Sequence, residues 1–334
     1  MKNALIFGLT GQDGAYLSDF LVKKGYKVFG TFRRTSHKCF ERLEEMGTMN
    51  DITKIKADLS DLISINAAIK ESQPDEVYNL AAQSFVGASF QQPILTADIT
   101  GLGTLRVLES MREHAPNAKF YQASSSEMYG NYAGIHDEES HFEPRSPYGV
   151  AKVFSHHMTN HFREAYNMFA CCGILFNHES PYRGIEFVTR KITYNLAAIK
   201  YGKLKKFSLG NIKAKRDWGF AGDYVEAMWL MLQQKEPDNY VVATGESHSV
   251  EEFLDLATEY AEMGDWHDFV EISEKNMRPT DIDELIGNAS KAKEKLNWKP
   301  KTSFKDLVRL MVEHDLNYFK LGMDPLRDKI YDND

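Results

Sequence analysis

The sequence predicts an α/β fold built on a doubly wound parallel sheet, with a smaller, discontinuous α/β domain for the substrate. Short apolar runs alternate with helical patterns through the first half of the chain, which is typical of βαβ units. A glycine-rich segment, Gly8-Leu9-Thr10-Gly11-Gln12-Asp13-Gly14, lies between the first apolar run and the first helical pattern. That context is typical of the phosphate-binding turn of a Rossmann-type dinucleotide domain.

The expected elements follow in chain order. Strands are expected over residues 4–8, 27–32, 52–57, 76–81, 119–124 and 169–176, with helices over 15–24, 60–72, 101–114 and 147–166. The last of these helices has a well-defined start, because Ser146 can cap it and Pro147 suits the first helical position. Further along we expect a strand over residues 240–243, which could return to the main sheet. We also expect helices over 223–233 and 301–319, and another that begins at the capping box at 249–252.

The pattern becomes irregular beyond residue 176, and this change predicts the domain organisation. We expect a cofactor domain over residues 1–178 plus about 214–244 and a substrate domain over about 179–213 plus 245–320, followed by a tail over 321–334. The ligands are expected in the cleft between the two domains.

Composition argues against several classes of protein. The net charge is −8 and the isoelectric point is about 5.8, which disfavours a general binder of nucleic acid or of anionic membranes. The three cysteines, Cys39, Cys171 and Cys172, suggest neither a disulfide framework nor a zinc site, so we expect no metal. We recognise no signal segment before the first strand and no apolar stretch long enough for a bilayer, and we expect a cytoplasmic protein.

The residues after the second strand indicate which dinucleotide binds. A domain specific for NAD carries an acidic residue there, whereas this chain reads Thr31-Phe32-Arg33-Arg34-Thr35-Ser36. Arginine forks and hydroxyl groups suit a 2′-phosphate, so the segment favours NADP over NAD. Two later strand ends, Asp58-Leu59 and Leu80-Ala81-Ala82-Gln83-Ser84, are placed to flank the adenine and the inner ribose.

Tyr148 and Lys152 lie four residues apart on one face of the helix expected over 147–166. A phenol titrates near about 10, too high for a good base at neutral pH. We expect the Lys152 ammonium to lower the pKa of Tyr148 and to hold the nicotinamide ribose. Ser125 is expected to hydrogen-bond the substrate oxygen that Tyr148 deprotonates.

Glu127 stands two residues beyond Ser125, in the run Ser124-Ser125-Ser126-Glu127-Met128-Tyr129-Gly130. A carboxylate beside the hydroxyl supplies a second acid/base, which can take a proton from carbon as well as from oxygen. That combination indicates elimination of water, not simple oxidation. The alternative is a solvated carboxylate on a loop.

These motifs resemble those of the extended short-chain dehydrogenase/reductases, and among them the GDP-mannose 4,6-dehydratase family. The resembling segments are residues 8–16 (GLTGQDGAY), 33–34 (RR), 77–89 (VYNLAAQSFVGAS), 121–130 (YQASSSEMYG), 145–152 (RSPYGVAK), 173–192 (GILFNHESPYRGIEFVTRKI), 215–222 (KRDWGFAG), 278–287 and 296–300. The resemblance covers nearly the whole chain. It departs at Ser125, where the family usually carries threonine, and at Tyr182, which replaces a small or basic residue.

The resemblance implies a redox-neutral conversion of GDP-D-mannose to GDP-4-keto-6-deoxy-D-mannose and water. Tyr148 removes the proton of the C4 hydroxyl while hydride passes from C4 to a tightly bound, recycled NADP. Glu127 then takes the C5 proton, and Ser125 with Glu127 assists departure of the C6 hydroxyl. Hydride finally returns to C6.

The resemblance also assigns binding residues. It places the GDP-sugar against Asn177, Glu179, Lys191, Arg216 and Arg278, to which we add Ser84, Ser125, Ser126 and Glu127. It places His178 beside the nicotinamide and Arg183 near the cofactor, and we add Leu95 to the cofactor site. A homodimer or homotetramer is implied, together with a downstream 4-keto-sugar reductase or epimerase-reductase.

The sequence also fits three other interpretations. A dehydratase acting on GDP-D-glycero-D-manno-heptose would fit a sugar pocket reshaped by Ser125 and Tyr182. A nucleotide-sugar 4-reductase or epimerase would use Tyr148, Lys152 and Ser125 without needing Glu127. A catalytically silent NADP-binding sensor could keep the glycines while losing the tyrosine and lysine.

Overall fold

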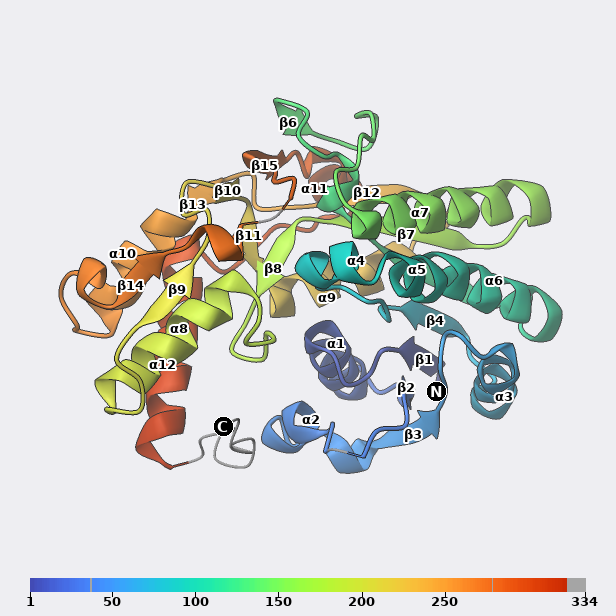
Figure 1. Cartoon of the computed structure of the whole chain (residues 1–334). Coiled ribbons are helices and arrows are strands. Elements are labelled where there is room, and N and C mark those ends of the chain that lie inside the picture. Colours follow the sequence, from blue (N-terminus) through green and yellow to red (C-terminus); the bar gives the residue numbers. More distant parts are fainter. Residues whose placement is uncertain (37, 278, 323–334) are drawn as a thin grey trace.

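The computed structural model describes residues 1–36, 38–277 and 279–322 (Figure 1). Its centre is a seven-stranded sheet in which every neighbouring pair of strands is parallel. The strand order is β12-β7-β5-β4-β1-β2-β3, with bounds β1 (Asn3–Phe7), β2 (Lys27–Phe32), β3 (Ile52–Lys56), β4 (Glu76–Asn79), β5 (Lys119–Ser125), β7 (Ala170–Leu175) and β12 (Asn239–Val242). The predicted parallel sheet is confirmed, and so is the return of the strand expected over 240–243.

Helices cover both faces of this sheet. One face carries α1 (Gln12–Lys23), α2 (Glu41–Glu45), α9 (Ala221–Leu232) and α11 (Ser290–Leu296), and the other carries α3 (Leu62–Ser72), α6 (Gly103–His114) and α7 (Pro147–Tyr166). Along β1, Ala4 and Ile6 pack on the first face, while Leu5 and Phe7 pack on the second. Burial on both faces explains why β1 is a continuous apolar run instead of an alternating one.

The order of the strands reverses between β1 and β4. From β1 the chain proceeds outward through β2 and β3, and it then returns to build β4, β5, β7 and β12 on the other side. In open sheets of this kind, ligands bind at the carboxyl ends of the strands beside such a reversal. The topology therefore indicates where the site lies before any side chain is considered.

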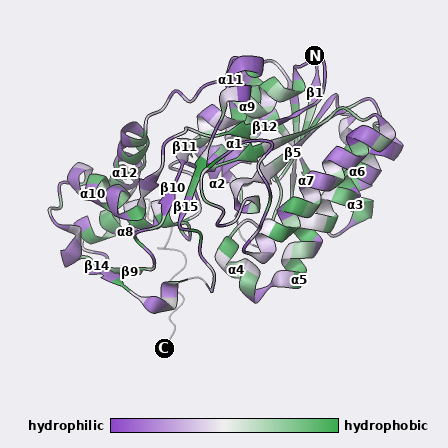
Figure 2. Ribbon diagram, turned by 90° about the horizontal axis from the view of Figure 1, so that it is seen from above, coloured by the Kyte–Doolittle hydropathy of each residue, from purple (hydrophilic) through white to green (hydrophobic). Residues whose placement is uncertain are grey.

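A second lobe lies beside the sheet, as both views show (Figures 1 and 2). Its helices α8 (Val188–Lys200), α10 (Val250–Tyr260) and α12 (Phe304–Lys320) enclose a core that includes Trp218, Phe253 and Phe304. Short strands form three smaller sheets with the orders β13-β10-β15-β6, β11-β8 and β14-β9. Their bounds are β6 (Ile135–His136), β8 (Asn177–Glu179), β9 (Phe207–Leu209), β10 (Lys215–Arg216), β11 (Trp218–Phe220), β13 (His248–Ser249), β14 (Val270–Ile272) and β15 (Glu284–Gly287). The predicted domain boundaries remain our proposal for dividing these two lobes.

Two predicted helix starts are confirmed. The hydroxyl of Ser146 accepts a hydrogen bond from the backbone N–H of Gly149 (3.0 Å), and Ser249 accepts one from Glu252 (3.0 Å). The helix expected over 101–114 differs, because a π-helical segment, Ala97–Leu102, precedes α6. Helices that the sequence pattern did not indicate are α2, α4 (Val86–Gln91), α5 (Pro93–Thr96), α8 and α11. Among the described helices, none combines the length and apolar character needed to cross a membrane.

Candidate active site

A cavity of about 180 Å³, termed the smaller cavity, lies at the carboxyl ends of β1, β4 and β5. Many of the residues predicted from sequence line it: Gly8, Gly11, Gln12, Asp13, Gly14, Leu80, Ala82, Ser84, Ser125, Ser126, Glu127, Tyr148, Lys152, Asn177, His178 and Arg183. They come from distant parts of the chain and meet beside the reversal of strand order. The smaller cavity therefore combines the glycine-rich turn with the proposed acid/base residues.

The glycine-rich turn has no room for side chains. Gly8 adopts a φ of +92°, and a Cβ added there would stand 2.9 Å from the backbone nitrogen of Ala81. A Cβ on Gly14 would stand 2.2 Å from the carbonyl oxygen of Gly8. Gly11 precedes α1 and offers no side-chain cap, so the first N–H groups of that helix remain available to an anion. This cradle fits the pyrophosphate of a dinucleotide.

Tyr148 and Lys152 project from the first turns of α7 and are both buried, with exposed fractions of 8% and 3%. The Lys152 ammonium donates a hydrogen bond to the carbonyl oxygen of Ala123 (2.6 Å) and lies 5.6 Å from the centre of the Tyr148 ring. The helix spacing therefore brings the pair together at the end of β5, as expected.

The expected lowering of the Tyr148 pKa by Lys152 is wrong for the chain alone. Burial raises the pKa of Tyr148 to about 12, although a hydrogen bond with Ser125 opposes this rise. Burial also lowers the pKa of Lys152 to about 8. Loss of water around both groups disfavours both charges, and the Lys152 ammonium is directed at a backbone carbonyl instead of the phenol oxygen.

Ser125 and Glu127 lie on the short turn that follows β5. Ser125 caps the 3₁₀ turn Ser126–Met128 by accepting a hydrogen bond from the backbone N–H of Glu127 (3.2 Å). The turn packs tightly on α7, because a Cβ on Gly149 would stand 2.7 Å from the carbonyl oxygen of Glu127. Glu127 is 8% exposed and its charge acts on Tyr148, so the carboxylate is part of the site and not a solvated loop residue.

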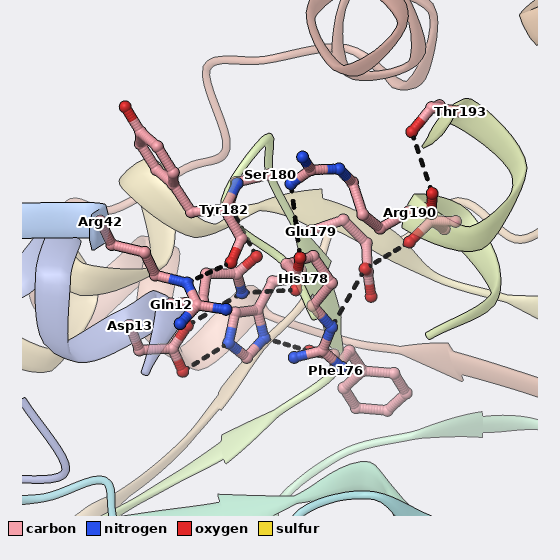
Figure 3. A network of polar contacts seen from close by, with 12 residues as sticks. Gln12, Asp13, Arg42, Phe176, His178, Glu179, Ser180, Tyr182, Arg190 and Thr193 are labelled. Carbon is pink, nitrogen blue, oxygen red and sulfur yellow. Dashed lines mark hydrogen bonds and ion pairs between the residues drawn. The ribbon is translucent and has the colours of Figure 1, made fainter. Parts of the chain in front are cut away.

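An ion pair between Asp13 and His178 forms part of the wall of the smaller cavity. The Nε2 atom of His178 lies 2.8 Å from the Asp13 carboxylate, and its Nδ1 atom lies 2.8 Å from the carbonyl oxygen of Phe176 (Figure 3). Burial alone would lower the pKa of His178, but the charge and hydrogen bond of Asp13 raise it. Conversely, burial would raise the pKa of Asp13, but His178 lowers it to about 2. Both ring nitrogens face acceptors, which suits the doubly protonated imidazolium.

A second cavity of about 790 Å³, termed the larger cavity, opens toward the second lobe. The sequence-predicted residues Glu127, Asn177, Glu179, Lys191 and Arg216 line it. Glu127, Asn177 and Phe187 line both cavities, so the two spaces meet at these three residues. A ligand long enough to reach this junction from the larger cavity would present one end to Glu127.

The remaining predicted residues lie in several places. Arg33, Arg34 and Ser36 are exposed after β2, and Asp58 and Leu59 follow β3. Thr10, Ala81 and Gln83 lie on the turns after β1 and β4, and Leu95 is 43% exposed on α5. Arg278 lies outside the described residues. Their roles stay predictions.

Two aromatic residues at the junction were not anticipated. The rings of Phe85 and Phe187 meet edge to face with their centres 5.5 Å apart. The guanidinium carbon of Arg183 lies 3.6 Å from the centre of the Phe187 ring, in a cation–π contact. A phenylalanine in a loop gives no signal that separates a cavity wall from ordinary packing, so the sequence could not indicate this pair.

Comparisons with known proteins agree on one family. Residues 5–311 match the family model described as GDP-mannose 4,6 dehydratase. GDP-mannose 4,6 dehydratase 1 of Arabidopsis thaliana is 52% identical over 96% of this chain and 91% of its own length. The Homo sapiens GDP-mannose 4,6 dehydratase is 47% identical over 95% of this chain and 92% of its own length.

Solved structures support the fold. A Thermus thermophilus UDP-glucose 4-epimerase in complex with NAD has a TM-score of 0.83 at 25% identity, covering 93% of this chain and 98% of that one. A Bacillus anthracis dTDP-glucose 4,6-dehydratase has a TM-score of 0.82 at 20% identity, covering 96% of this chain and 97% of that one. With the family match and the relatives together, this chain belongs to the GDP-mannose 4,6-dehydratase family.

Proposed function

We propose that the chain converts GDP-D-mannose to GDP-4-keto-6-deoxy-D-mannose and water. The observation that carries this proposal is the position of Glu127, which is buried at the junction of the two cavities beside Tyr148 and Ser125. A simple reductase or epimerase needs one acid/base for an alcohol. A second buried carboxylate supplies the base that removal of a carbon-bound proton requires.

Tyr148 receives the proton of the C4 hydroxyl, and the Ser125 hydroxyl orients that oxygen. A nicotinamide bound in the smaller cavity would accept hydride from C4 and return it to C6. Once C4 is a ketone, the proton on C5 is acidic, and Glu127 removes it. Ser125 and Glu127 then assist departure of the C6 hydroxyl as water, which carries away the proton that Glu127 took from C5. As hydride returns to C6, a proton would return to C5, so substrate and product are at the same overall oxidation level.

We propose NADP as the nicotinamide cofactor, tightly bound and recycled. The turn from Gly8 to Gly14 and the start of α1 would hold its pyrophosphate, and Lys152 would contact the inner ribose. His178 and Arg183 line the same cavity and would stand at the nicotinamide end. The exposed arginines Arg33 and Arg34 would meet the 2′-phosphate.

The larger cavity suits the nucleotide part of the substrate. Among the described residues, its wall carries two basic side chains, Lys191 and Arg216, together with the carboxylates of Glu127, Glu179, Glu186 and Asp281. Arg216 lies 3.4 Å from Asp281, so a diphosphate would share this guanidinium with that carboxylate. Asn177 and Glu179 add hydrogen-bonding groups nearer the junction. We propose that the diphosphate contacts the two basic side chains, which leaves the hexose at the junction beside Glu127.

We also infer that the chain assembles as a homodimer or homotetramer through an apolar face. This face, termed the α5–α7 face, includes the exposed side chains of Ile94, Leu102, Val150 and Phe154. Exposed apolar patches of this kind mark interaction sites.

We infer a cytoplasmic enzyme, since the described thiols are unpaired. We also infer a downstream 4-keto-sugar reductase or epimerase-reductase, which would consume the reactive ketone of the product.

The test is mass spectrometry of the purified chain incubated with GDP-mannose and no added reductant. The proposed function requires loss of one water from the sugar nucleotide with no net consumption of NADP(H). Unchanged mass with GDP-mannose, followed by water loss from GDP-D-glycero-D-manno-heptose, would reassign the substrate. Unchanged mass with both would overturn the proposal.

A further inference from the structure

The segment over residues 178–183 contributes to both cavities. His178 and Arg183 line the smaller cavity, while Glu179 lines the larger one. The segment begins with the last two residues of β8 and turns back through a hydrogen bond from the N–H of Arg183 to the carbonyl oxygen of Ser180 (3.0 Å). Its position relative to the glycine-rich turn therefore sets the distance between the two ligands.

Gln12 forms one connection between these two segments. Its amide nitrogen donates a hydrogen bond to the carbonyl oxygen of His178 (3.0 Å), and its amide oxygen accepts one from the Ser180 hydroxyl (2.7 Å). Figure 3 shows both contacts beside the ion pair of Asp13 and His178. Gln12 and Asp13 also line the smaller cavity, so both would be affected directly by a bound ligand.

Arg42 forms a second connection from outside the cavities. Its Nε atom donates a hydrogen bond to the carbonyl oxygen of Tyr182 (2.7 Å), and one terminal nitrogen donates to the carbonyl oxygen of Thr10 (2.9 Å). Figure 3 shows the guanidinium beside Tyr182 and Gln12. Arg42 is half-buried on α2 and does not belong to the described lining of either cavity.

The geometry of arginine matters for this connection. Both acceptors are backbone carbonyls, one from the glycine-rich turn and one from the 178–183 segment, and a planar guanidinium directs separate N–H groups at each. A lysine keeps the positive charge but is a single point donor on a flexible stem. The side chain at position 182 is not involved, since the contact is with its carbonyl oxygen.

We propose that Arg42 is a positioning residue that couples cofactor binding to substrate binding. It holds the 178–183 segment in register with the glycine-rich turn, so a ligand that orders one segment also orders the other. The inference rests on the proposed function for its ligands, NADPH and GDP. It predicts that GDP tightens the binding of NADPH, and by linkage that NADPH tightens the binding of GDP equally.

The test measures the affinity of the full chain for NADPH by fluorescence, with and without saturating GDP. For the wild-type chain we expect GDP to tighten NADPH binding by about fivefold or more, the lower end of typical coupling between two sites. In Arg42→Lys and Arg42→Gln the tightening should fall to within about twofold of no effect. The tightening is the ratio of the two NADPH affinities within each variant, so a change in NADPH affinity alone does not alter it.

Arg163→Lys is the matched control. Arg163 is also half-buried and joins two elements, since it contacts Asn239 at the start of β12 (3.0 Å), but it lies far along α7 from the site. This variant should retain the wild-type response to GDP. If Arg163→Lys also loses the response to GDP, the loss in the Arg42 variants reflects general loosening of the fold, and the proposal is overturned.

Two further outcomes contradict the proposal. They are a wild-type chain whose NADPH affinity does not respond to GDP, and an Arg42→Lys chain that keeps the full response. Neither measurement requires turnover, so the mass measurement on GDP-mannose decides the proposed function separately.

In active enzyme, Arg42→Lys should also lower kcat at least about tenfold more than Arg163→Lys does, because misplacing a reactant by about 1 Å can reduce the rate a hundredfold.

Discussion

Burial moves the pKa values of Tyr148 and Lys152 away from their ordinary values in the direction of the neutral forms. The phenol is thereby a poor base in the chain alone, while the lysine loses its charge at an accessible pH. In the mechanism we propose, Tyr148 acts as a base only in the assembled site, where Ser125 and a charged Lys152 act together.

Lys152 gives the first prediction, a decline of kcat/KM as the pH rises above about 8, where its ammonium is lost.

The free energy of unfolding should change in the opposite direction. The lowered pKa means that the unfolded chain binds more protons between about pH 8 and the ordinary lysine value, so the free energy of unfolding rises with pH there. A pH series of kcat/KM and of urea unfolding checks both. Lys152→Arg should move the decline to higher pH, and an unmoved decline would assign it to another group.

Glu127→Gln should block water loss more strongly than oxidation at C4. The amide cannot take the C5 proton but preserves the size of the side chain and the turn that Ser125 caps. We expect product formation to fall by about 10²-fold or more, the usual contribution of a positioned acid/base, with a 4-keto hexose and reduced cofactor accumulating. Quenched-flow mass spectrometry detects that intermediate. Normal formation of the deoxy product would remove Glu127 from the mechanism.

Arg33→Ala should weaken the binding of NADP more than that of NAD. An arginine that bonds a phosphate contributes about 1.5–3 kcal/mol, or roughly tenfold to a hundredfold in affinity. Titration of the cofactor-free chain with both dinucleotides checks this prediction, and Arg112→Ala, on the exposed end of α6, is the control. Equal losses for NADP and NAD would refute the contact with the 2′-phosphate.

At the scale of elements, the N-caps of α3 and α7 provide a matched pair. Asp61 accepts hydrogen bonds from Ile63 (3.0 Å) and Ser64 (3.3 Å) at an exposed helix start, whereas buried Ser146 caps the helix of Tyr148 and Lys152. Asp61→Ala and Ser146→Ala should each cost about 1 kcal/mol of stability. Only Ser146→Ala should also lower kcat, because its helix carries the acid/base pair. Denaturant unfolding and steady-state rates separate the two, and equal effects on kcat would contradict this assignment.

The sequence predicted elements well where local chemistry determines them. Ser146 and Pro147 mark the start of α7, and the apolar run through β1 matches a strand buried on both faces. It did not predict α8, whose first turns hold β-branched Val188, Thr189, Ile192 and Thr193, residues of lower helix propensity. Packing of α8 on α10 and α12 determines this helix, and such contacts are not visible locally.

The site follows the same division between residues that local sequence indicates and residues that only the fold brings together. Residues in motifs, such as Tyr148 and Glu127, can be proposed from the sequence because their spacing has a chemical meaning, and the structure brings both to the smaller cavity. Arg42 was not, because it acts through backbone carbonyls of Thr10 and Tyr182 that are far apart in sequence. The lowered pKa of Lys152 was also missed, since burial depends on the whole fold.

At the scale of the whole molecule, the α5–α7 face should control assembly. Phe154→Glu places a charge on this apolar face, which an interface would have to desolvate. We expect the oligomer to dissociate at micromolar concentration while the chain remains folded. Analytical ultracentrifugation measures the mass, and Leu310→Glu, at an exposed apolar residue on α12, is the control. An unchanged oligomer in Phe154→Glu would place the interface elsewhere.

The junction of the two cavities at Glu127, Asn177 and Phe187 also bears on the order in which ligands bind and leave. A sugar nucleotide that enters through the larger cavity reaches the junction with its hexose first and can depart by the same route after turnover. The dinucleotide on the other side of the junction then has no need to exchange between cycles. Steady-state rates should therefore follow a one-substrate rate law, with product inhibition that is competitive against the GDP-sugar and insensitive to added dinucleotide.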